Sequence, residues 1–407
     1  MPRWTLLCTL LIIVATAGTS TVRAQTVEAS IDLRLVDSKA TRSYLEGGLG
    51  TLRYGDQQFG IQLGRARLAL TLPIGQVLEL KLDGSSWGDS DRNPFDLTEA
   101  YLEFRPYPFA GLRARIRAGA FFPPTTLENT ASGWDSPYTI SSSALDTWVG
   151  EELRTIGAQG QLEWLGTRLG HDFDVGLVAA VFGWNDPAGV ALANQGFAID
   201  DRQTNLFGRV GEPGARPVSG VQLFHEIDGR AGVYGGISVR YLDRLSMIAL
   251  HYDNRGDPSA LDTTLGEHAW HTRFTTAGVR VEPSDGWIVI AQWMQGETYI
   301  APTDLSELEW GFDTRYFLVS RRFGRQMATV RYDGFTVSPE APTIRGNQNG
   351  HALTLTYGFE PTASWRMMLE WVRVRSGQSN RLIYFGQDPF ATDSALQLSV
   401  RYSFESG

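Results

Sequence analysis

The feature that most constrains this chain is the alternation in its final stretch, residues 395–404, which reads ALQLSVRYSF. Alternate positions from Leu396 onward are apolar and end on Tyr402 and Phe404, whereas the positions between them are polar and include Arg401. Successive side chains of a β-strand point to opposite faces, so this pattern predicts a strand with one apolar and one wet face. Such a strand closes a transmembrane barrel when it pairs with the first strand, with lipid outside and water inside.

The same alternation recurs along the chain in strands of roughly ten residues, separated in turn by tight turns and longer polar connections. Long connections are expected at residues 37–59, 87–96, 122–151, 185–231, 254–269, 298–306, 338–349 and 376–393. Residues 218–228 are placed inside the fourth of these, because one more strand would break the even count that such barrels show. The sequence therefore predicts an all-β fold: a transmembrane antiparallel β-barrel of about 16 strands, with long extracellular loops and short periplasmic turns.

The outward parity is apolar and is expected to face lipid, as at Leu68, Leu102, Ile116, Trp293 and Leu369. Several soluble all-β domains with one wet face would show the same alternation, and this alternative stays open on alternation alone. Separate soluble domains do not predict that every strand along the chain follows the same apolar alternation while short and long connections alternate.

The first residues have the pattern of a secretory signal: Arg3, an apolar run over residues 6–17, and small residues before Gln25. We therefore expect a signal peptide at residues 1–24 and a single outer-membrane β-barrel domain at residues 25–407. The chain has one cysteine, Cys8, which lies in the signal, so neither disulfides nor thiolate metal sites are expected. The formal net charge of −9 argues against nucleic-acid binding.

The inward parity is rich in charge, and we predict that it lines a pore. The residues assigned to the pore lining are Arg65, Arg67, Lys81, Glu99, Glu103, Arg113, Arg115, Arg117, Arg331, Arg366 and Arg401. Arg240, Arg280 and Arg315 are assigned to the same side.

Three of these arginines, Arg113, Arg115 and Arg117, occupy alternate positions of one strand and form a ladder with steps of about 6.6–6.8 Å. Guanidinium groups stay charged at neutral pH and offer forked donors, so an anion could pass between them. The alternative is that Glu99 and Glu103 on the neighbouring strand pair with the ladder and leave little selectivity.

The third long connection, residues 122–151, is expected to fold into the lumen as a constriction loop. Its acids would then face the arginines of the wall: Glu128, Asp135, Asp146 and Glu151. An ordinary exterior loop is the alternative.

Residues 112–128, LRARIRAGAFFPPTTLE, contain a pattern of Gly, any residue, Phe, two residues, Pro, two residues, Leu and Glu. With the preceding EAYLEF at residues 99–104, this stretch resembles the phosphate-selective porin O/P-type family, closely over some thirty residues. The resemblance implies a sixteen-stranded outer-membrane porin, a homotrimer, and a third loop inside the barrel. Phe122 stands where that family often has lysine, and the inward face mixes arginine with acids, so phosphate selectivity does not follow.

Catalytic signatures are lacking in the sequence: there is no G-x-S-x-G elbow, zinc-protease motif or P-loop. His268 and His271 are the only neighbouring histidines, and a surface position suits them better than metal binding. We therefore expect no enzyme, catalytic residue, cofactor or metal.

Two functions remain from the sequence. The first is a porin for passive diffusion of small polar solutes, anion-preferring through the ladder. The alternative is a structural or adhesive outer-membrane barrel with an occluded lumen. The expected partners are membrane lipids and lipopolysaccharide, small polar or anionic solutes, and two further copies in a homotrimer, without nucleic acid. The expected location is the outer membrane of a Gram-negative bacterium.

Overall fold

The computed structural model describes residues 25–89, 95–214, 220–303, 306–341 and 345–406. The expected signal peptide at residues 1–24 lies outside the described residues.

Strands dominate the described chain. Those of the barrel are β1 (Thr26–Ser38), β2 (Phe59–Ile74), β3 (Leu78–Ser86), β4 (Asp96–Phe104), β5 (Leu112–Phe121), β6 (Thr155–Trp164), β7 (Phe173–Gly183), β8 (Gly232–Tyr241), β9 (Leu245–Asp253), β12 (His271–Val281), β13 (Trp287–Thr303), β14 (Ser306–Phe323), β15 (Gln326–Pro339), β16 (Gln348–Thr362), β17 (Trp365–Gln378) and β18 (Phe390–Ser406). A separate hairpin consists of β10 (Leu261–Asp262) and β11 (Glu267–His268). The helices lie in the connections: η1 (Tyr44–Glu46), α2 (Ala144–Glu152), η2 (Gly166–Leu169), α3 (Val190–Gln195) and α4 (Ser379–Phe385).

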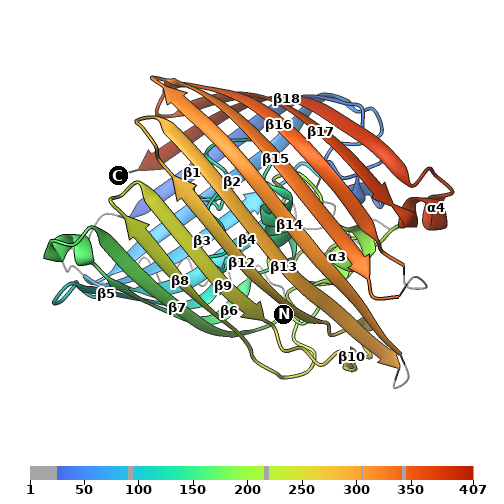
Figure 1. Cartoon of the computed structure of the whole chain (residues 1–407), viewed down its shortest axis with the longest axis horizontal. Coiled ribbons are helices and arrows are strands. Elements are labelled where there is room, and N and C mark those ends of the chain that lie inside the picture. The colour runs from blue at the N-terminus through green and yellow to red at the C-terminus, as the bar shows by residue number, and fades with distance from the viewer. Residues whose placement is uncertain (1–24, 90–94, 215–219, 304–305, 342–344, 407) are drawn as a thin grey trace.

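The sixteen barrel strands form one closed antiparallel sheet in which each strand pairs with its neighbours along the chain (Figure 1). Closure comes from β1 and β18, which pair from Val27 with Ser406 to Ser38 with Ala395. The predicted sixteen-stranded antiparallel barrel is confirmed, and the final strand has the closing role expected of it.

Short and long connections alternate as predicted, with one error. Residues 298–306 were expected to form a long loop, but β13 and β14 continue to Thr303 and Ser306, and these two residues pair. The register shifts between Ile300 and Thr303, around Pro302. Proline has no backbone N–H to donate, so a strand tolerates it at such an irregularity, and here it does not end the hairpin.

The fourth connection contains no barrel strand among its described residues. Only Val221 of the stretch in question forms a bridge, which is isolated and joins Val210 in the same connection. The described part of this stretch, residues 220–228, therefore adds no strand to the barrel, as expected.

Outward side chains are apolar and exposed around most of the wall. Leu68, Leu102, Ile116 and Leu369 each keep between 42% and 49% of their surface exposed, although they belong to regular paired strands. Apolar side chains standing outside a closed sheet require a lipid environment. Within the described residues, no helix has both the length and the apolar character needed to cross a membrane.

Candidate functional site in the lumen

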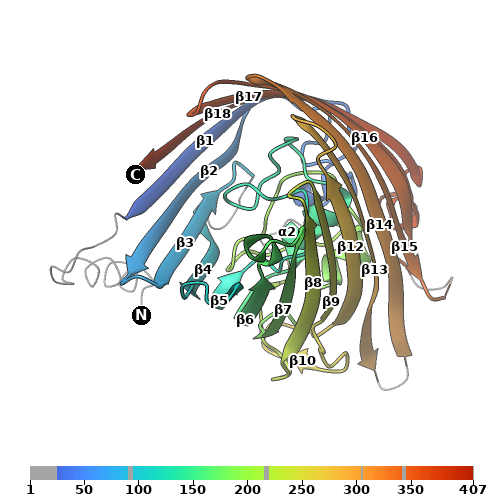
Figure 2. The same ribbon diagram turned by 60° about the vertical axis from the view of Figure 1, so that its left-hand side comes forward.

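The third long connection, residues 122–154, runs inside the barrel and includes α2 (Figure 2). The backbone N–H groups of Ile140 and Ser141 donate to the carboxylate of Glu370 on β17, at 2.6 and 2.9 Å. Because β17 is distant from β5 and β6 in the sheet order, the connection crosses the lumen to reach it.

A buried ion cluster anchors this connection to β15. Arg331 donates from Nη1 to Oε1 of Glu128 at 2.6 Å and from Nε to Oδ2 of Asp333 at 2.9 Å. All three side chains are fully buried. Arg331 also donates to the carbonyl oxygens of Ser141 and Ser142, at 2.6 and 2.8 Å. Charges taken out of water need compensation of this kind, and losing one partner of such a cluster is costly.

The fourth connection, residues 184–231, is fastened to the third by Glu152 at the end of α2. This carboxylate accepts hydrogen bonds from the N–H groups of Ala191 and Leu192 in α3, at 2.8 and 3.1 Å, and from the indole of Trp148 at 2.5 Å. Gly189 donates to it as well. We call the described residues of 122–154 and 184–231 the plug.

The plug shares an apolar core with the inner wall. Trp148 of α2 lies at its centre, with its ring centroid 5.4 Å from that of Phe274 on β12 and 5.0 Å from that of Phe312 on β14. Phe197 of the fourth connection packs edge-on against the same indole at 6.4 Å. Other inward apolar residues that complete this core are Leu250, Ile290, Met294, Leu318, Phe335, Val372 and Val374. Close-packed protein, not water, therefore fills this side of the lumen.

The arginine ladder lies on the opposite wall, on β5. Arg117 donates to Oε2 of Glu103 on β4 at 2.7 Å, and Nε of Arg115 lies 3.9 Å from the same oxygen. Arg113 pairs with Glu163 of β6. The side chains of Arg113 and Arg115 remain 37% and 28% exposed, so the ladder keeps contact with water.

The open alternative for the ladder was pairing with Glu99 and Glu103. Glu103 does pair with it, whereas the Glu99 carboxylate accepts the backbone N–H of Phe122 at 3.1 Å. Glu99 therefore positions the start of the plug at the end of β5.

A cavity of about 370 Å³ separates this wall from the plug. Phe122 and Trp134 of the plug, which stack at 4.4 Å, contribute its apolar surface. Its charged lining residues balance in sign: Arg67, Lys81, Arg117, Glu28, Asp83 and Glu99. A space of this size and polarity can hold a small polar solute.

Asp135 of the plug contacts two arginines of the inner wall. Its carboxylate accepts hydrogen bonds from Arg65 at 2.7 Å and from Arg401 at 2.6 Å. Burial disfavours ionisation of Asp135, but the charges of Arg401 and Arg65 outweigh it and hold the pKa of this carboxyl below its usual value. Arg366 of β17 is placed beside them and donates to the Ser136 carbonyl at 3.3 Å.

The other two acids of the plug lie away from the arginine wall. Asp146 lies in the first turn of α2, where its carboxylate accepts hydrogen bonds from the hydroxyls of Thr126 and of the N-cap residue Ser143, at 2.9 and 3.2 Å. The Tyr44 hydroxyl lies within hydrogen-bond distance of both Glu151 and Asp200, 2.8 Å from Oδ2 of the latter, and can donate its single hydrogen to only one of the two carboxyls. Burial raises the pKa of both carboxyls, and a neighbouring acid adds to the effect: Asp200 for Glu151 and Asp201 for Asp200. Asp146 and Glu151 therefore hold the plug together and do not face the ladder.

Arg315 is a wrong assignment. Its side chain is 72% exposed and lies on the outer surface, because its neighbour Tyr316 is the buried, inward residue of β14. Arg240 and Arg280 do lie on the inward parity, paired with Asp174 at 2.8 Å and with Glu282 at 2.6 Å.

A second buried ion cluster was missed by the sequence reasoning. Arg34 on β1 binds Asp32 at 2.7 Å and Asp201 of the plug at 2.6 Å, and Arg53 binds Asp201 at 3.1 Å. The inward parity of Asp32 and Arg34 was the available signal. Their partners, Arg53 and Asp201, lie in long loops, where no sequence pattern indicated a buried ion cluster.

One group of three carboxylates in the described chain could reach a common metal ion: Asp186, Glu226 and Asp228. Backbone donors already occupy much of it. Asp186 accepts the N–H groups of Ile227 and Asp228 at 2.5 and 3.2 Å, and Glu226 accepts that of Trp184 at 2.8 Å. These bonds explain the convergence as turn structure.

The closed sixteen-stranded sheet, its apolar outer face and its charged lumen define a class: an outer-membrane β-barrel of the porin type. This architecture places the chain in the outer membrane.

No family model and no curated protein matches the chain. Solved structures share its fold at low sequence identity. The outer membrane channel DcaP of Acinetobacter baumannii has a TM-score of 0.55 at 11% identity, over 94% of this chain and 96% of that one. An anion-selective porin from Comamonas acidovorans has 0.53 at 13% identity, over 94% and 99%. A loop-deleted form of OmpT, an outer membrane protein of Vibrio cholerae, has 0.54 at 11% identity, over 94% and 100%.

Proposed function

We propose that the chain is an outer-membrane porin that lets small polar solutes diffuse passively across the outer membrane of a Gram-negative bacterium. One observation carries the proposal: the barrel keeps a cavity with a charged lining beside β2–β5, although the apolar core of the plug packs against the rest of the inner wall. A solute path along that wall would be narrow, which restricts it to small molecules.

The proposal includes a preference for anions. Arg113 and Arg115 are only partly neutralised and keep water contact, and Lys81 is 30% exposed on the same wall. The resemblance of residues 112–128 to the phosphate-selective porin O/P-type family supports the same preference. So does the shared fold with the anion-selective porin of Comamonas acidovorans.

The proposed assembly is a homotrimer surrounded by membrane lipids and lipopolysaccharide. The fold shared with the trimer form of OmpT from Vibrio cholerae supports the trimer. The apolar outer face supports the lipid contact.

Planar-bilayer recording tests this function. The purified protein should give discrete conductance steps and a reversal potential that favours anions across a KCl gradient. Changing Arg113, Arg115 and Arg117 together to Ala should reduce that preference or reverse it. A control that removes two exposed arginines outside the plug and the ladder, R255A/R273A, should leave it unchanged. Unaltered selectivity in the ladder variant would remove the ladder from the mechanism.

The second candidate is a structural or adhesive barrel with an occluded lumen. The apolar core around Trp148 favours it, because close packing excludes water from that side of the barrel. Under this alternative the unaltered protein would be silent in the bilayer, and Trp148→Ala, which loosens the plug, would conduct.

A further inference from the structure

The outer wall over β9–β14 has a sharp boundary between apolar and polar side chains, fixed by strand register. One row of paired outward residues consists of Ala249, Ala277, Trp293 and Arg315. The next outward row toward the loop ends consists of His251, Thr275, Gln295 and Asp313. The first row toward the periplasm consists of Met247, Val279, Ala291 and Phe317. The Arg315 row is therefore the upper edge of the apolar band on this side.

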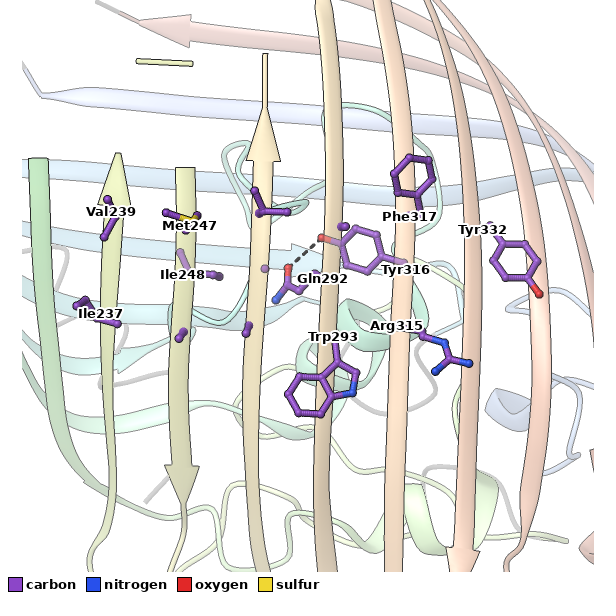
Figure 3. Close-up of a pocket in the computed structure, with 15 residues that line it drawn as sticks. Ile237, Val239, Met247, Ile248, Gln292, Trp293, Arg315, Tyr316, Phe317 and Tyr332 are labelled. Atoms are coloured by element: carbon purple, nitrogen blue, oxygen red, sulfur yellow. Dashed lines mark hydrogen bonds between the residues drawn. The ribbon is translucent and has the colours of Figure 1, made fainter. Parts of the chain in front are cut away.

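An open depression of about 700 Å³ lies in the wall below this edge. Its lining includes the small residues Ala249, Ala277 and Ala291 and the large rings of Trp293 and Phe317, which Figure 3 labels. Its shape and apolar lining suit a hydrocarbon chain.

Arg315 stands at the upper end of the depression without a strong partner. Its nearest carboxylate, Asp313, is 3.8 Å away and already accepts the indole N–H of Trp293 at 2.7 Å. Gly334 is its neighbour on β15, where an added Cβ atom would lie 3.6 Å from Nε of Arg315, so the Arg315 side chain lies against the backbone of β15 at this point. Figure 3 shows the guanidinium extending from β14 toward Tyr332 of β15.

The depth of Arg315 agrees with a headgroup position. It lies eight residues from Phe323 at the periplasmic end of β14, which is roughly 27 Å along the strand at about 3.4 Å per residue. With a strand tilt of about 40°, this is roughly 20 Å of height in an apolar band about 25 Å tall. A lone arginine at the midplane of the band would cost about 2–4 kcal/mol, but the cost falls toward the interface.

More cations continue the same row. Gly334 pairs with His351 on β16, and His351 pairs with Arg375 on β17. The side chain of Arg375 is exposed, as is that of Arg373 one outward position nearer the periplasm. Within the described chain no carboxylate forms an ion pair with either arginine. The edge of the apolar band thus presents outward guanidinium groups, of which Arg315 has only the 3.8 Å contact with Asp313 and the described residues give Arg375 no ion pair.

We propose that this wall binds a phosphorylated, multiply acylated lipid of the outer leaflet, namely lipopolysaccharide. One acyl chain lies in the depression beside Trp293 and Phe317, and the phosphates bind Arg315 and Arg375 through charge-assisted hydrogen bonds. The inference rests on the proposed outer-membrane setting and not on conduction.

Native mass spectrometry of the protein in a zwitterionic detergent tests the site. The protein is titrated with lipopolysaccharide, with the same lipid after enzymatic removal of its phosphates, and with phosphatidylethanolamine. We expect retention of the phosphorylated lipid only, and roughly a tenfold weaker affinity for each of Arg315→Gln and Arg375→Gln. Arg273→Gln is the matched control, because Arg273 is exposed and outward but lies beyond the edge row, paired with Glu297. It should bind as the unaltered protein does.

A second variant tests the depression. Ala277→Trp places a large side chain in its lining and should weaken binding without removing a charge. Equal affinity in both arginine variants and the control, or equal binding of the dephosphorylated lipid, would overturn the proposal. It would also be overturned if Ala277→Trp left lipid binding intact but dissociated an oligomer, since the face would then be an interface between copies. Conductance of the arginine variants, measured separately, should match the unaltered protein, so failure of this site is distinguishable from failure of the porin function.

Discussion

Arg331 of β15 donates to Glu128 of the third connection at 2.6 Å, and neither side chain has any exposed surface. The two residues are 203 positions apart in the sequence, so this contact joins the inside of the wall to a loop that starts between β5 and β6. This buried ion pair fixes the position of the third connection against β15.

Glu128→Gln should loosen the plug. The amide keeps the shape but loses the charge, and Arg331 is left with Asp333 alone. We expect a loss of about 3–5 kcal/mol in the local stability of the plug, the range for breaking a buried pair. Hydrogen exchange of residues 136–143 should accelerate accordingly, and single-channel recordings should show more frequent opening.

The control for this variant is Glu360→Gln, which removes the acid of an exposed pair with Arg322 at 2.6 Å. An exposed pair contributes at most about 1 kcal/mol, so exchange within the plug should not change. Equal effects of the two substitutions would contradict the anchoring role of Glu128.

Trp148→Ala should empty the centre of the plug core. The loss of a buried indole costs about 3–5 kcal/mol, because the surrounding rings from β12 and β14 cannot collapse into the space. Exchange of residues 144–152 should rise, while the heat-dependent mobility shift of the folded barrel on a gel should persist. Trp287→Ala, on the outward face of β13, is the matched control and should leave the plug unaltered. Protection of α2 that survives Trp148→Ala would show that the core does not hold it.

The plug should loosen as pH rises. Burial raises the pKa of Glu152 to about 7, against an ordinary value of 4.5, although its N–H partners act in the opposite direction. The neutral acid therefore stabilises the folded plug below about pH 4.5, and this stability is lost as pH rises through about 7. The full loss is on the order of 3 kcal/mol.

Open probability in the bilayer, measured from pH 5 to pH 8, should increase for the unaltered protein. Glu151 and Asp200 lie close by and their raised pKa values act in the same direction. Glu152→Gln stays neutral at every pH and should flatten the response in part. A response that is unchanged in this variant would assign the pH dependence to Glu151 and Asp200 instead.

Glu103→Gln should strengthen anion selectivity. The carboxylate is buried, and its oxygens lie 2.7–3.9 Å from the cationic groups of Lys81, Arg105, Arg115 and Arg117. Removing its charge leaves these cations facing the lumen, so the anion-to-cation permeability ratio should rise severalfold in dilute salt. The rise should shrink at 1 M salt, where the Debye length falls to about 3 Å. The exposed loop substitution Glu340→Gln should have no effect, and a fall in the ratio would contradict the assignment.

The sheet could be predicted from the sequence because the residues that face lipid are apolar and occupy alternate positions of each strand. Arg401 lies on the inward parity and contacts Asp135 of the plug, as the unambiguous polar face of its strand indicates. Arg315 was assigned to the wrong face, because both parities of its strand are apolar: Phe317 faces lipid, while Tyr316 and Leu318 are buried against the plug. The rule that the lumenal face is polar fails wherever a loop supplies an apolar core.

The position of the third connection was expected, but its content was not. Ser143 caps α2 by accepting the N–H of Asp146, and four of the nine helix residues are apolar: Ala144, Leu145, Trp148 and Val149. Its packing partners, such as Phe197 and Phe274, come from distant parts of the chain. Contacts of such long sequence separation leave no local periodicity to detect.

The pairing of β1 with β18 has a consequence for how the molecule assembles. The barrel cannot close until β18 has been synthesised. The apolar residues of the plug therefore lack the complete barrel wall that buries them until nearly the whole chain has been made. Contacts between chain ends form slowly, and exposed apolar surface invites aggregation during the delay. Biogenesis of this protein therefore requires that the open barrel, with the plug only partly buried, does not aggregate with other chains before β1 pairs with β18.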